Sequence, residues 1–431
     1  MAAGLSKTKW NATLPTSFSL AGGSLDVQLS YEGRKTELDI LATEPAKVSL
    51  VWQGISTANR LYFGENLSIL SQLLSDDELR GKVRLIYIDP PYATRGVFQT
   101  RSQKDAYVDL LEGSHYIEFI RERLIFLREL LAPNGSIYIH LDENMAFYVK
   151  VVMDEVFGKS NFRNWITRKK CNPKNYTRKT YGDISDYILF YTKSDEYVWN
   201  RAYDKWTDEK ALKEYSYIEE GTGRRYKKVP VHAPGTRNGE TGKMWREMEP
   251  PPGKHWQYTP KTLDAMDARG EIFWSSNGNP RRKVYLDESE GIPAQDIWLD
   301  FKDAHNQNIE ITGYPTEKNP AMLKRIIEAS SNPDDLVLDC FSGSGTTLDV
   351  ASQLKRRWIG VDNSHEAIRT TRHRFAHGAQ PMGDDGDKKI KTPPQMLPLF
   401  RITDFELYTE IHHKDELAEL IKQWREWINA D

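Results

Sequence analysis

A carboxylate and two prolines stand together in the motif Asp89-Pro90-Pro91-Tyr92. The run before it, Val83-Arg84-Leu85-Ile86-Tyr87-Ile88, is apolar nearly throughout, which is typical of a strand buried on both faces of a parallel sheet. The prolines favour a rigid turn that cannot continue as a helix. The motif therefore predicts a fixed carboxylate and a fixed backbone carbonyl at the end of a central strand. The alternative is a structural turn in which Asp89 caps a helix.

A rigid pair of acceptors suits the exocyclic amine of a nucleobase, whose lone pair is delocalised into the ring. Asp89 and the Pro90 carbonyl can accept the amine hydrogens and favour a pyramidal nitrogen that attacks a sulfonium methyl. Tyr92 can stack on the base, and such stacking contributes about 1–3 kcal/mol, comparable to the cost of flipping a base from a duplex. Alignment of the reacting atoms can supply up to about 7–11 kcal/mol. This chemistry requires no metal and no covalent intermediate.

A second motif begins where another apolar strand pattern, Leu336-Val337-Leu338-Asp339, gives way to a glycine-rich turn and a predicted helix. Glycines at this place let a ligand approach backbone N–H groups closely, and the place itself is a ligand crevice in open α/β sheets. The predicted ligand contacts are Asp339, Phe341, Ser342, Gly343, Ser344, Gly345, Thr346 and Thr347.

The composition of this turn narrows the class of ligand. A triphosphate loop needs a Lys after its last Gly, and Thr346 follows Gly345 here. A dinucleotide fingerprint needs a third Gly, which is missing. What remains is a nucleoside cofactor whose two ribose hydroxyls donate to Asp362, at the end of the next predicted strand. A tight structural turn with an incidental acid stays open as the alternative.

Together the two motifs resemble those of the DNA amino-methyltransferases, which have an [Asp/Asn/Ser]-Pro-Pro-aromatic catalytic loop and a Phe-x-Gly-x-Gly cofactor loop. The catalytic loop comes first, as in the permuted β group. The resemblance covers about residues 60 to 375 and includes the segments 61–67, 139–158 and 313–318. Residues 251–256 and 295–298 look most like the modification subunits of type III restriction systems and their solitary relatives.

The resemblance implies an S-adenosylmethionine cofactor, to which it adds the contacts Glu65, Asn66, Thr316 and Lys318. Two positions depart from the family pattern: Glu65 stands where Asp is usual, and Asn319 follows Lys318 where Pro is usual. Asp at the start of the catalytic loop is more often associated with adenine, and Ser with cytosine. We therefore expect methyl transfer to the N6 amine of adenine in duplex DNA, by base flipping. The alternatives are the N4 amine of cytosine, an RNA acceptor, a catalytically idle specificity subunit and a nicotinamide oxidoreductase.

A basic stretch beside the catalytic half is interleaved with aromatic residues and has no acid before Asp183. Clustered cations of this kind suit phosphate contact, which gives affinity without sequence information. A solvated loop is the alternative. The predicted DNA contacts are Arg163, Arg168, Lys169, Lys170, Lys174, Arg178 and Lys179. Further cations lie at 224–228 and 281–283.

The chain has 431 residues, which suggests about two or three domains at roughly 150 residues each. We expect a doubly wound, Rossmann-like α/β fold, permuted and interrupted by a target-recognition insertion. The expected parts are a β-rich lead-in (1–59), a catalytic half (60–203), the insertion (204–302), a cofactor half (303–378), and a linker with a C-terminal helix (379–431).

Composition excludes some classes of protein. No apolar run approaches the roughly 20 residues of a membrane helix, and the first residues lack the apolar region of a secretory signal. The two cysteines, Cys171 and Cys340, form no zinc pattern, and no metal site is expected. We expect a cytoplasmic protein that binds double-stranded DNA; the resemblance also allows for a restriction subunit and for a homodimer.

Overall fold

The computed structural model describes residues 27–54, 58–91, 113–172, 179–303, 310–311, 317–377, 380–381, 405–411, 418 and 422. The chain forms two compact units, one made of residues 1–200 with 295–431 and the other of residues 201–294. Four predicted site residues lie outside the described residues: Tyr92, Lys174, Arg178 and Thr316. Of the helix predicted at the C-terminus, only positions 418 and 422 are described.

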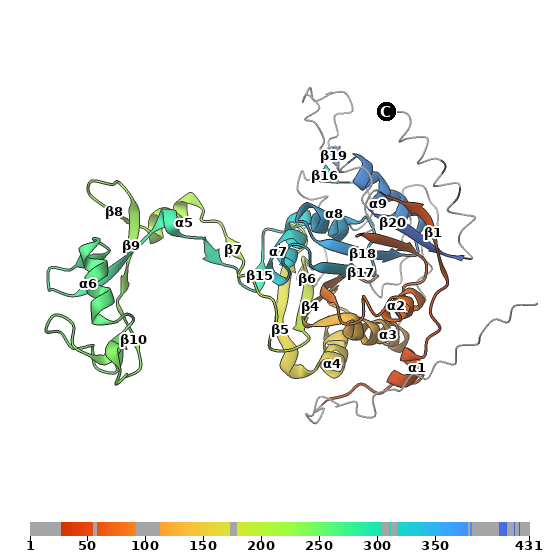
Figure 1. The fold of residues 1–431 in the computed structure, drawn as a ribbon, viewed down its shortest axis with the longest axis horizontal. Coiled ribbons are helices and arrows are strands. Elements are labelled where there is room, and N and C mark those ends of the chain that lie inside the picture. Colours follow the sequence, from red (N-terminus) through yellow and green to blue (C-terminus); the bar gives the residue numbers. More distant parts are fainter. Residues whose placement is uncertain are drawn as a thin grey trace, which may run out of the picture. The chain divides into compact units, whose positions relative to one another are not determined.

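The first unit is built on a ten-stranded sheet (Figure 1). Its strands, in spatial order, are β1 (Val48–Gln53), β20 (Glu406–Glu410), β2 (Arg60–Phe63), β18 (Arg357–Asp362), β17 (Leu336–Asp339), β3 (Val83–Ile88), β4 (Leu131–Leu141), β6 (Ser185–Thr192), β5 (Phe162–Lys169) and β15 (Ile297–Trp298). The run from β20 to β4 is parallel throughout. Strand β6 is antiparallel to both β4 and β5, and β1 is antiparallel to β20.

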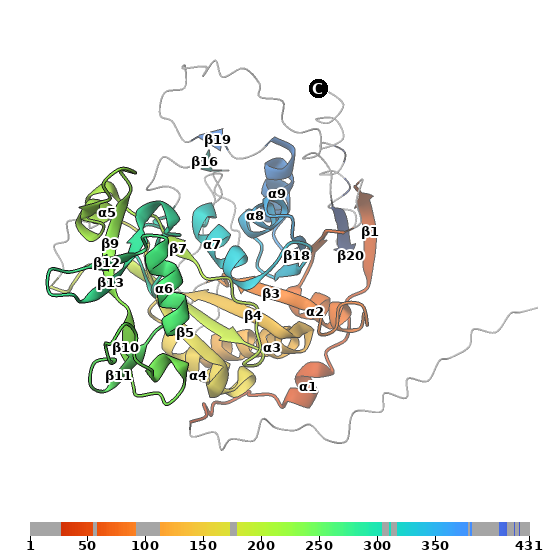
Figure 2. The ribbon, with the colours of Figure 1, turned by 60° about the vertical axis from the view of Figure 1, so that its left-hand side comes forward.

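Helices cover both faces of this sheet (Figure 2). One face packs against α2 (Asn66–Leu74), α3 (Ser114–Leu130) and α4 (Ala146–Phe157), and the other against α7 (Pro320–Ser330), α8 (Thr346–Gln353) and α9 (His365–His377). Alternation along the strands feeds both cores: in β3, Ile86 and Ile88 join the first, and Leu85 and Tyr87 the second. The central strands are apolar throughout because both their faces are buried, and the predicted doubly wound fold is confirmed.

Strand β4 contains the sequence Pro133-Asn134-Gly135 near its start. It nevertheless runs without a break from Leu131. Its pairing with β3 jumps from Val83↔Leu131 to Leu85↔Ser136. The extra residues are accommodated as a bulge, which lets the chain bend without leaving the sheet.

The second unit contains a four-stranded sheet in the order β12 (Ile272–Trp274), β13 (Pro280–Tyr285), β9 (Arg225–Pro230) and β8 (Tyr217–Ile218). Its other elements are β7 (Tyr203–Asp204), α5 (Asp208–Glu214), β10 (His232–Pro234), η2 (Glu240–Gly242), β11 (Lys254–Trp256), α6 (Pro260–Ala268), η3 (Leu286–Glu288) and β14 (Ile292–Pro293). A small core with Trp245 and Trp256 holds it together. The insertion was predicted to end at 302, whereas this unit ends at Ala294, because β15 pairs with β5 of the main sheet.

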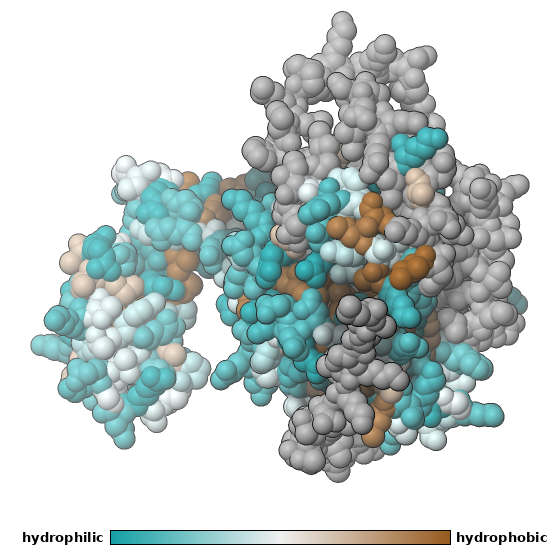
Figure 3. Space-filling model, turned by 45° about the vertical axis from the view of Figure 1, so that its right-hand side comes forward, coloured by the Kyte–Doolittle hydropathy of each residue, from teal (hydrophilic) through white to brown (hydrophobic). Residues whose placement is uncertain are grey.

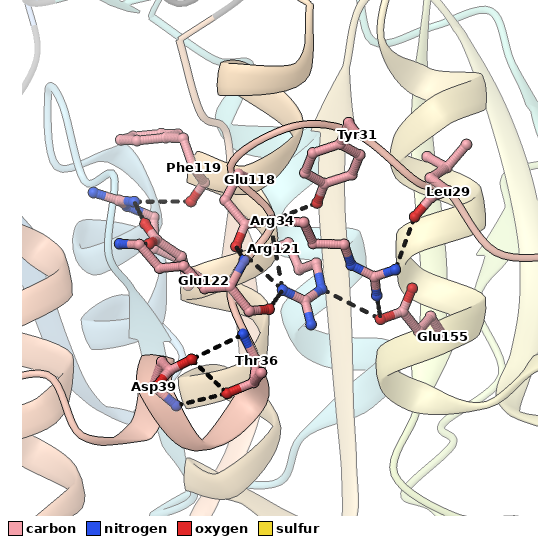
Figure 4. A network of polar contacts seen from close by, with 12 residues as sticks. Leu29, Tyr31, Arg34, Thr36, Asp39, Glu118, Phe119, Arg121, Glu122 and Glu155 are labelled. Carbon is pink, nitrogen blue, oxygen red and sulfur yellow. Dashed lines mark hydrogen bonds and ion pairs between the residues drawn. The ribbon is translucent and has the colours of Figure 1, made fainter.

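The segment before β1 lies against the helices of the first unit (Figure 4). Tyr31 donates to Glu118 of α3 at 2.5 Å, and Arg34 forms an ion pair with Glu155 of α4. A capping box at Thr36 then starts α1 (Glu37–Leu41). The described part of the lead-in therefore has a structural role on the outer face of α3 and α4.

The remaining short elements are η1 (Lys159–Asn161), β16 (Glu310–Ile311) and β19 (Gln380–Pro381), the last two paired with each other. No helix in the described part of the chain is long and apolar enough to cross a membrane. The visible surface of the described residues is mostly hydrophilic, with smaller apolar patches (Figure 3).

Candidate active site

The carboxyl ends of the parallel strands meet at one edge of the main sheet, and polar residues follow that edge. Asp362 ends β18, Asp339 ends β17, and Asp89 follows β3 directly. Each acid stands two or four residues after a side chain that packs against α7, α8 and α9: Asp89 after Tyr87, Asp339 after Val337 and Asp362 after Trp358. Strand alternation therefore directs all three carboxylates to the same face, in the crevice where open α/β sheets bind ligands.

The glycine loop closes over this edge between β17 and α8. The backbone N–H of Gly343 donates to Asp362 Oδ2 at 2.8 Å, and the N–H of Ser342 donates to the Val361 carbonyl at 3.1 Å. Gly345 has φ +73°, and a Cβ there would lie 2.6 Å from Thr371 Oγ1. Glycine is therefore required at 345 both by its left-handed backbone and by the close approach of α9.

Asp339 is buried and Asp362 is half-buried, and neither acid forms an ion pair with a cation in the described part of the chain. Burial raises the pKa of Asp339 to about 7, although the Phe341 N–H and the Thr347 side chain act against it. Burial likewise raises the pKa of Asp362 to about 6, against the N–H groups of Ser364 and Gly343. Buried acceptors of this kind suit a ligand that brings its own hydrogen-bond donors.

Residues of α2 and α3 form a wall next to the loop. Asn66 Nδ2 donates to the Cys340 carbonyl at 2.9 Å, and Arg123 Nε donates to Asn66 Oδ1 at 2.6 Å. Arg123 also pairs with Glu65. The Phe119 ring lies 6.0 Å from the Phe341 ring, between their centroids. Arg123 and Phe119 were missed by sequence reasoning, since both look like ordinary residues of an amphipathic helix.

The segment before α7 joins the glycine loop to the catalytic turn. Lys318 Nζ lies 2.7 Å from Asp89 Oδ2. The neighbouring Glu317 forms a fully buried ion pair with Arg374 of α9, which also donates to the Ser344 carbonyl at 2.8 Å. Asn319 caps α7 by accepting from the Ala321 N–H at 2.9 Å. Asn at this position is therefore a capping residue, which gives a local reason for the departure from Pro.

A polar row of three side chains, His140, Asp186 and Arg168, continues the edge beyond Asp89. His140 of β4 has its Nδ1 3.9 Å from Asp89 Oδ1 and 2.9 Å from the Tyr87 hydroxyl. Its Nε2 lies 2.9 Å from Asp186 Oδ2 of β6. Arg168 of β5 donates to Asp186 at 3.0 Å. His140 and Asp186 are not among the predicted site residues; only the antiparallel pairing of β4, β6 and β5 brings them together.

One predicted DNA contact is wrong. Arg168 was expected to contact phosphate, but its side chain is fully buried and also binds the Phe301 carbonyl and Asp303. Arg163 bonds to Thr192 and Asp195, and Lys170 pairs with Asp183 at 2.7 Å. The alternation of β5 explains the error: a basic strand exposes only part of its cations. Lys169 and Lys179 make no ion pair with a described residue.

The arrangement fits a nucleoside cofactor with donor hydroxyls. Ser342 Oγ is buried without a described partner, and neither Asp339 nor Asp362 forms an ion pair with a described cation. Within the described ranges, no group of three or more His, Cys, Asp or Glu residues could hold a metal ion.

Comparison with known proteins identifies the family. Residues 83–373 match the DNA methylase family. The type II methyltransferase M.EcaI of Enterobacter cloacae is 44% identical over 419 residues, covering 93% of this chain and 91% of that protein. The Mod subunit of the type III restriction-modification enzyme StyLTI of Salmonella typhimurium is 26% identical over 330 residues, 69% of this chain and 50% of that subunit.

Solved structures give more distant similarities. The complex of M1.HpyAVI with SAM aligns with a TM-score of 0.41 and 18% identity, over 73% of this chain and 98% of that one. The cytosine-N4-specific PvuII DNA methyltransferase aligns with a TM-score of 0.43 and 13% identity, over 78% and 92%. The family match and the 44% identical relative are sufficient to assign the chain to a family. The chain belongs to the DNA methylase family and is an S-adenosylmethionine-dependent DNA methyltransferase.

Proposed function

We propose that the enzyme methylates the N6 amine of adenine in duplex DNA. The supporting observation is the turn after β3, where Asp89 is paired with Lys318 at 2.7 Å and is followed directly by the buried Pro90. Asp89 and the Pro90 carbonyl each accept one hydrogen of the amine, which directs the nitrogen lone pair outward. Asp at this position, rather than Ser, favours adenine over the amine of cytosine.

The cofactor-binding half of the proposal rests on the edge of β17 and β18. Asp362 accepts hydrogen bonds from the ribose hydroxyls, and the residues from Phe341 to Thr347 enclose the rest of the nucleoside. When bound, S-adenosylmethionine supplies an electrophilic sulfonium methyl group. Asn66 and Arg123 hold the loop from behind, which keeps its position fixed before the cofactor arrives. Tyr92, which lies outside the described residues, is assigned to stack on the flipped base.

The proposed reaction is tested by the product. The protein is incubated with methyl-labelled S-adenosylmethionine and duplex DNA, and the digested nucleosides are separated by mass spectrometry. We expect the label on N6-methyladenine, and none with Asp89→Ala. Label on N4-methylcytosine overturns the choice of base, and unchanged transfer by Asp89→Ala overturns the role of the carboxylate.

We also assign target recognition to the second unit, where cations line one face of its four-stranded sheet. Lys228 lies directly opposite Lys283, and Phe273 opposite Arg281. Like charges placed opposite each other destabilise a sheet, so their presence suggests an anionic partner. Lys283 is paired with Glu219 at 2.7 Å, and Lys228 lies over the rings of Tyr217 and Phe273, 3.6 and 3.4 Å from their centroids, without a described carboxylate partner. The double variant Lys228→Ala/Arg281→Ala should weaken specific DNA binding and leave cofactor affinity unchanged, as checked by titration with labelled duplexes.

Two predicted assemblies stay predictions. A restriction subunit is suggested by relatives such as the StyLTI Mod subunit, which forms part of a restriction-modification enzyme. A homodimer is the other. Light scattering of the purified chain, alone and mixed with a candidate restriction subunit, measures both.

A further inference from the structure

The polar row beside Asp89 is almost completely buried. His140 and Arg168 have no exposed surface, and Asp186 is 3% exposed. The next residues on the same face of their strands are apolar: Tyr138, Ile188 and Ile166 lie two positions away from His140, Asp186 and Arg168. Burying charges costs several kcal/mol per ion unless they are fully paired. Three buried polar side chains on adjacent strands therefore need a reason other than stability.

Hydrogen bonds fix the orientation of the histidine ring. Burial by itself raises the pKa of Asp186, but His140 and Arg168 outweigh it and lower that pKa to about 2. Asp186 is therefore an anion that accepts from His140 Nε2–H. Nδ1 and the Tyr87 hydroxyl are hydrogen-bonded at 2.9 Å. Burial raises the pKa of Tyr87, so its hydroxyl keeps its own proton.

The fixed ring edge lies against the carboxylate that handles the amine. His140 Nδ1 is 3.9 Å from Asp89 Oδ1, while Lys318 Nζ is 2.7 Å from Oδ2. The carboxylate therefore has an ion pair on one side and, on the other, an imidazole whose orientation is fixed by its own hydrogen bonds. A separation of 3.9 Å is too long for a hydrogen bond but within the range of a charge interaction between the ring and the carboxylate.

We propose that His140, held by Asp186 and Arg168, is the positioning residue that sets the orientation of the Asp89 carboxylate for the amine. Arg168 anchors the row at its far end, through the Phe301 carbonyl and Asp303. These two residues belong to the segment by which the chain returns from the second unit to the first. The inference rests on the proposed role of Asp89 but not on which base is methylated.

The test separates orientation from binding and folding. In single-turnover methylation, His140→Leu should lower the rate constant about 100-fold, the scale of a misplacement of about 1 Å. Its affinities for S-adenosylmethionine and DNA should stay within about two-fold of the parent. His140→Gln, which keeps a donor for Asp186, should recover part of the rate. Asp186→Asn should lower the rate by a smaller factor and covers the case in which His140→Leu does not fold.

Tyr138→Phe is the matched control. Tyr138 is buried on the same face of β4 and loses only its hydrogen bond to Ser330, which is 2.7 Å long. Its rate constant should be that of the parent. The proposal is overturned if His140→Gln and Asp186→Asn keep the parental rate, or if Tyr138→Phe slows the reaction as much as they do. Nucleosides from the parent enzyme identify the methylated base separately, so a cytosine product would contradict the adenine assignment and leave this test valid.

Discussion

The two halves of the binding edge treat buried carboxylates in opposite ways. On β17 and β18, burial raises the pKa of Asp339 to about 7 and that of Asp362 to about 6, and no described cation pairs with either acid. Beyond β3, Asp186 is buried as deeply as Asp339, yet its contacts with His140 and Arg168 lower its pKa to about 2. The difference lies in the partner, because burial alone favours the neutral acid in both places.

This difference suggests a division of labour. The catalytic half has its charges compensated within the chain, so its geometry is set before any substrate binds. The cofactor half keeps acceptors that are still uncompensated, and the donors of a ligand complete them. Three predictions test or refine this contrast, beginning with the largest effect.

The first prediction removes the charge of the catalytic carboxylate. Asp89→Asn keeps the size of the side chain but loses the anion that accepts the amine hydrogen, and it leaves Lys318 without this ion pair. We expect the single-turnover rate to fall by about 1,000-fold, on the scale of losing one preorganised transition-state contact. Cofactor affinity should change little. Asp183→Asn, an exposed acid paired with Lys170, is the control and should keep the parental rate. A similar loss in both variants would contradict the assignment.

The second prediction asks whether the cofactor half depends on the buried ion pair between Glu317 and Arg374, which contacts the glycine loop. Glu317→Gln removes the nearer carboxylate of Arg374, which is 1% exposed, and leaves only the longer contact with Asp349 at 3.8 Å among the described ion pairs. Removing one partner of a buried pair costs about 3–5 kcal/mol, so the denaturant midpoint should fall strongly. Cofactor affinity should fall as well, because Arg374 holds the Ser344 carbonyl.

The control for this variant lies on α9, the helix that carries Arg374. Glu366→Gln breaks an exposed pair with Arg369 and should cost about 1 kcal/mol or less. Equal losses in the two variants would show that burial of the pair is irrelevant.

Part of the fold and of the candidate site could be predicted from the sequence. The central strands and the two motifs were placed correctly, because a strand buried on both faces has an unmistakable apolar run and because Pro and Gly constrain the backbone locally. Asp89, Asp339 and Asp362 follow from their positions at strand ends.

The partners of Asp89 and Asp186 could not be predicted from the sequence. Lys318 reaches Asp89 across more than half the chain, and Arg168 reaches Asp186 only because β5 and β6 pair in one register. A basic run gives no sign of which of its cations points inward, so Arg168 was mistaken for a phosphate contact. Long-range pairing is set by tertiary packing, and a single sequence records it only as residue types.

The third prediction concerns pH. If ribose hydroxyls donate to ionised Asp362, S-adenosylmethionine affinity should fall as the pH drops below about 6, approaching ten-fold for each further unit. The cofactor-free protein should show the opposite trend. An acid whose folded pKa is raised stabilises the fold at low pH, and this contribution is lost as the pH rises from about 4 through about 6 for Asp362 and about 7 for Asp339. Calorimetric titration and thermal unfolding from pH 5 to 8 measure both.

Asp362→Asn decides whether this acid is responsible. The variant cannot ionise, so its cofactor affinity should be weak and much less dependent on pH, and its cofactor-free stability should fall less as the pH rises. Asp186→Asn serves as the contrast, because an acid with a pKa of about 2 contributes its stability unchanged above pH 5 and loses it only as the pH falls toward 2. It should therefore leave the slope of affinity against pH intact. If both variants flatten the plot of cofactor affinity against pH, the pH dependence does not come from Asp362 alone, and the proposed contrast between the two halves of the edge is wrong.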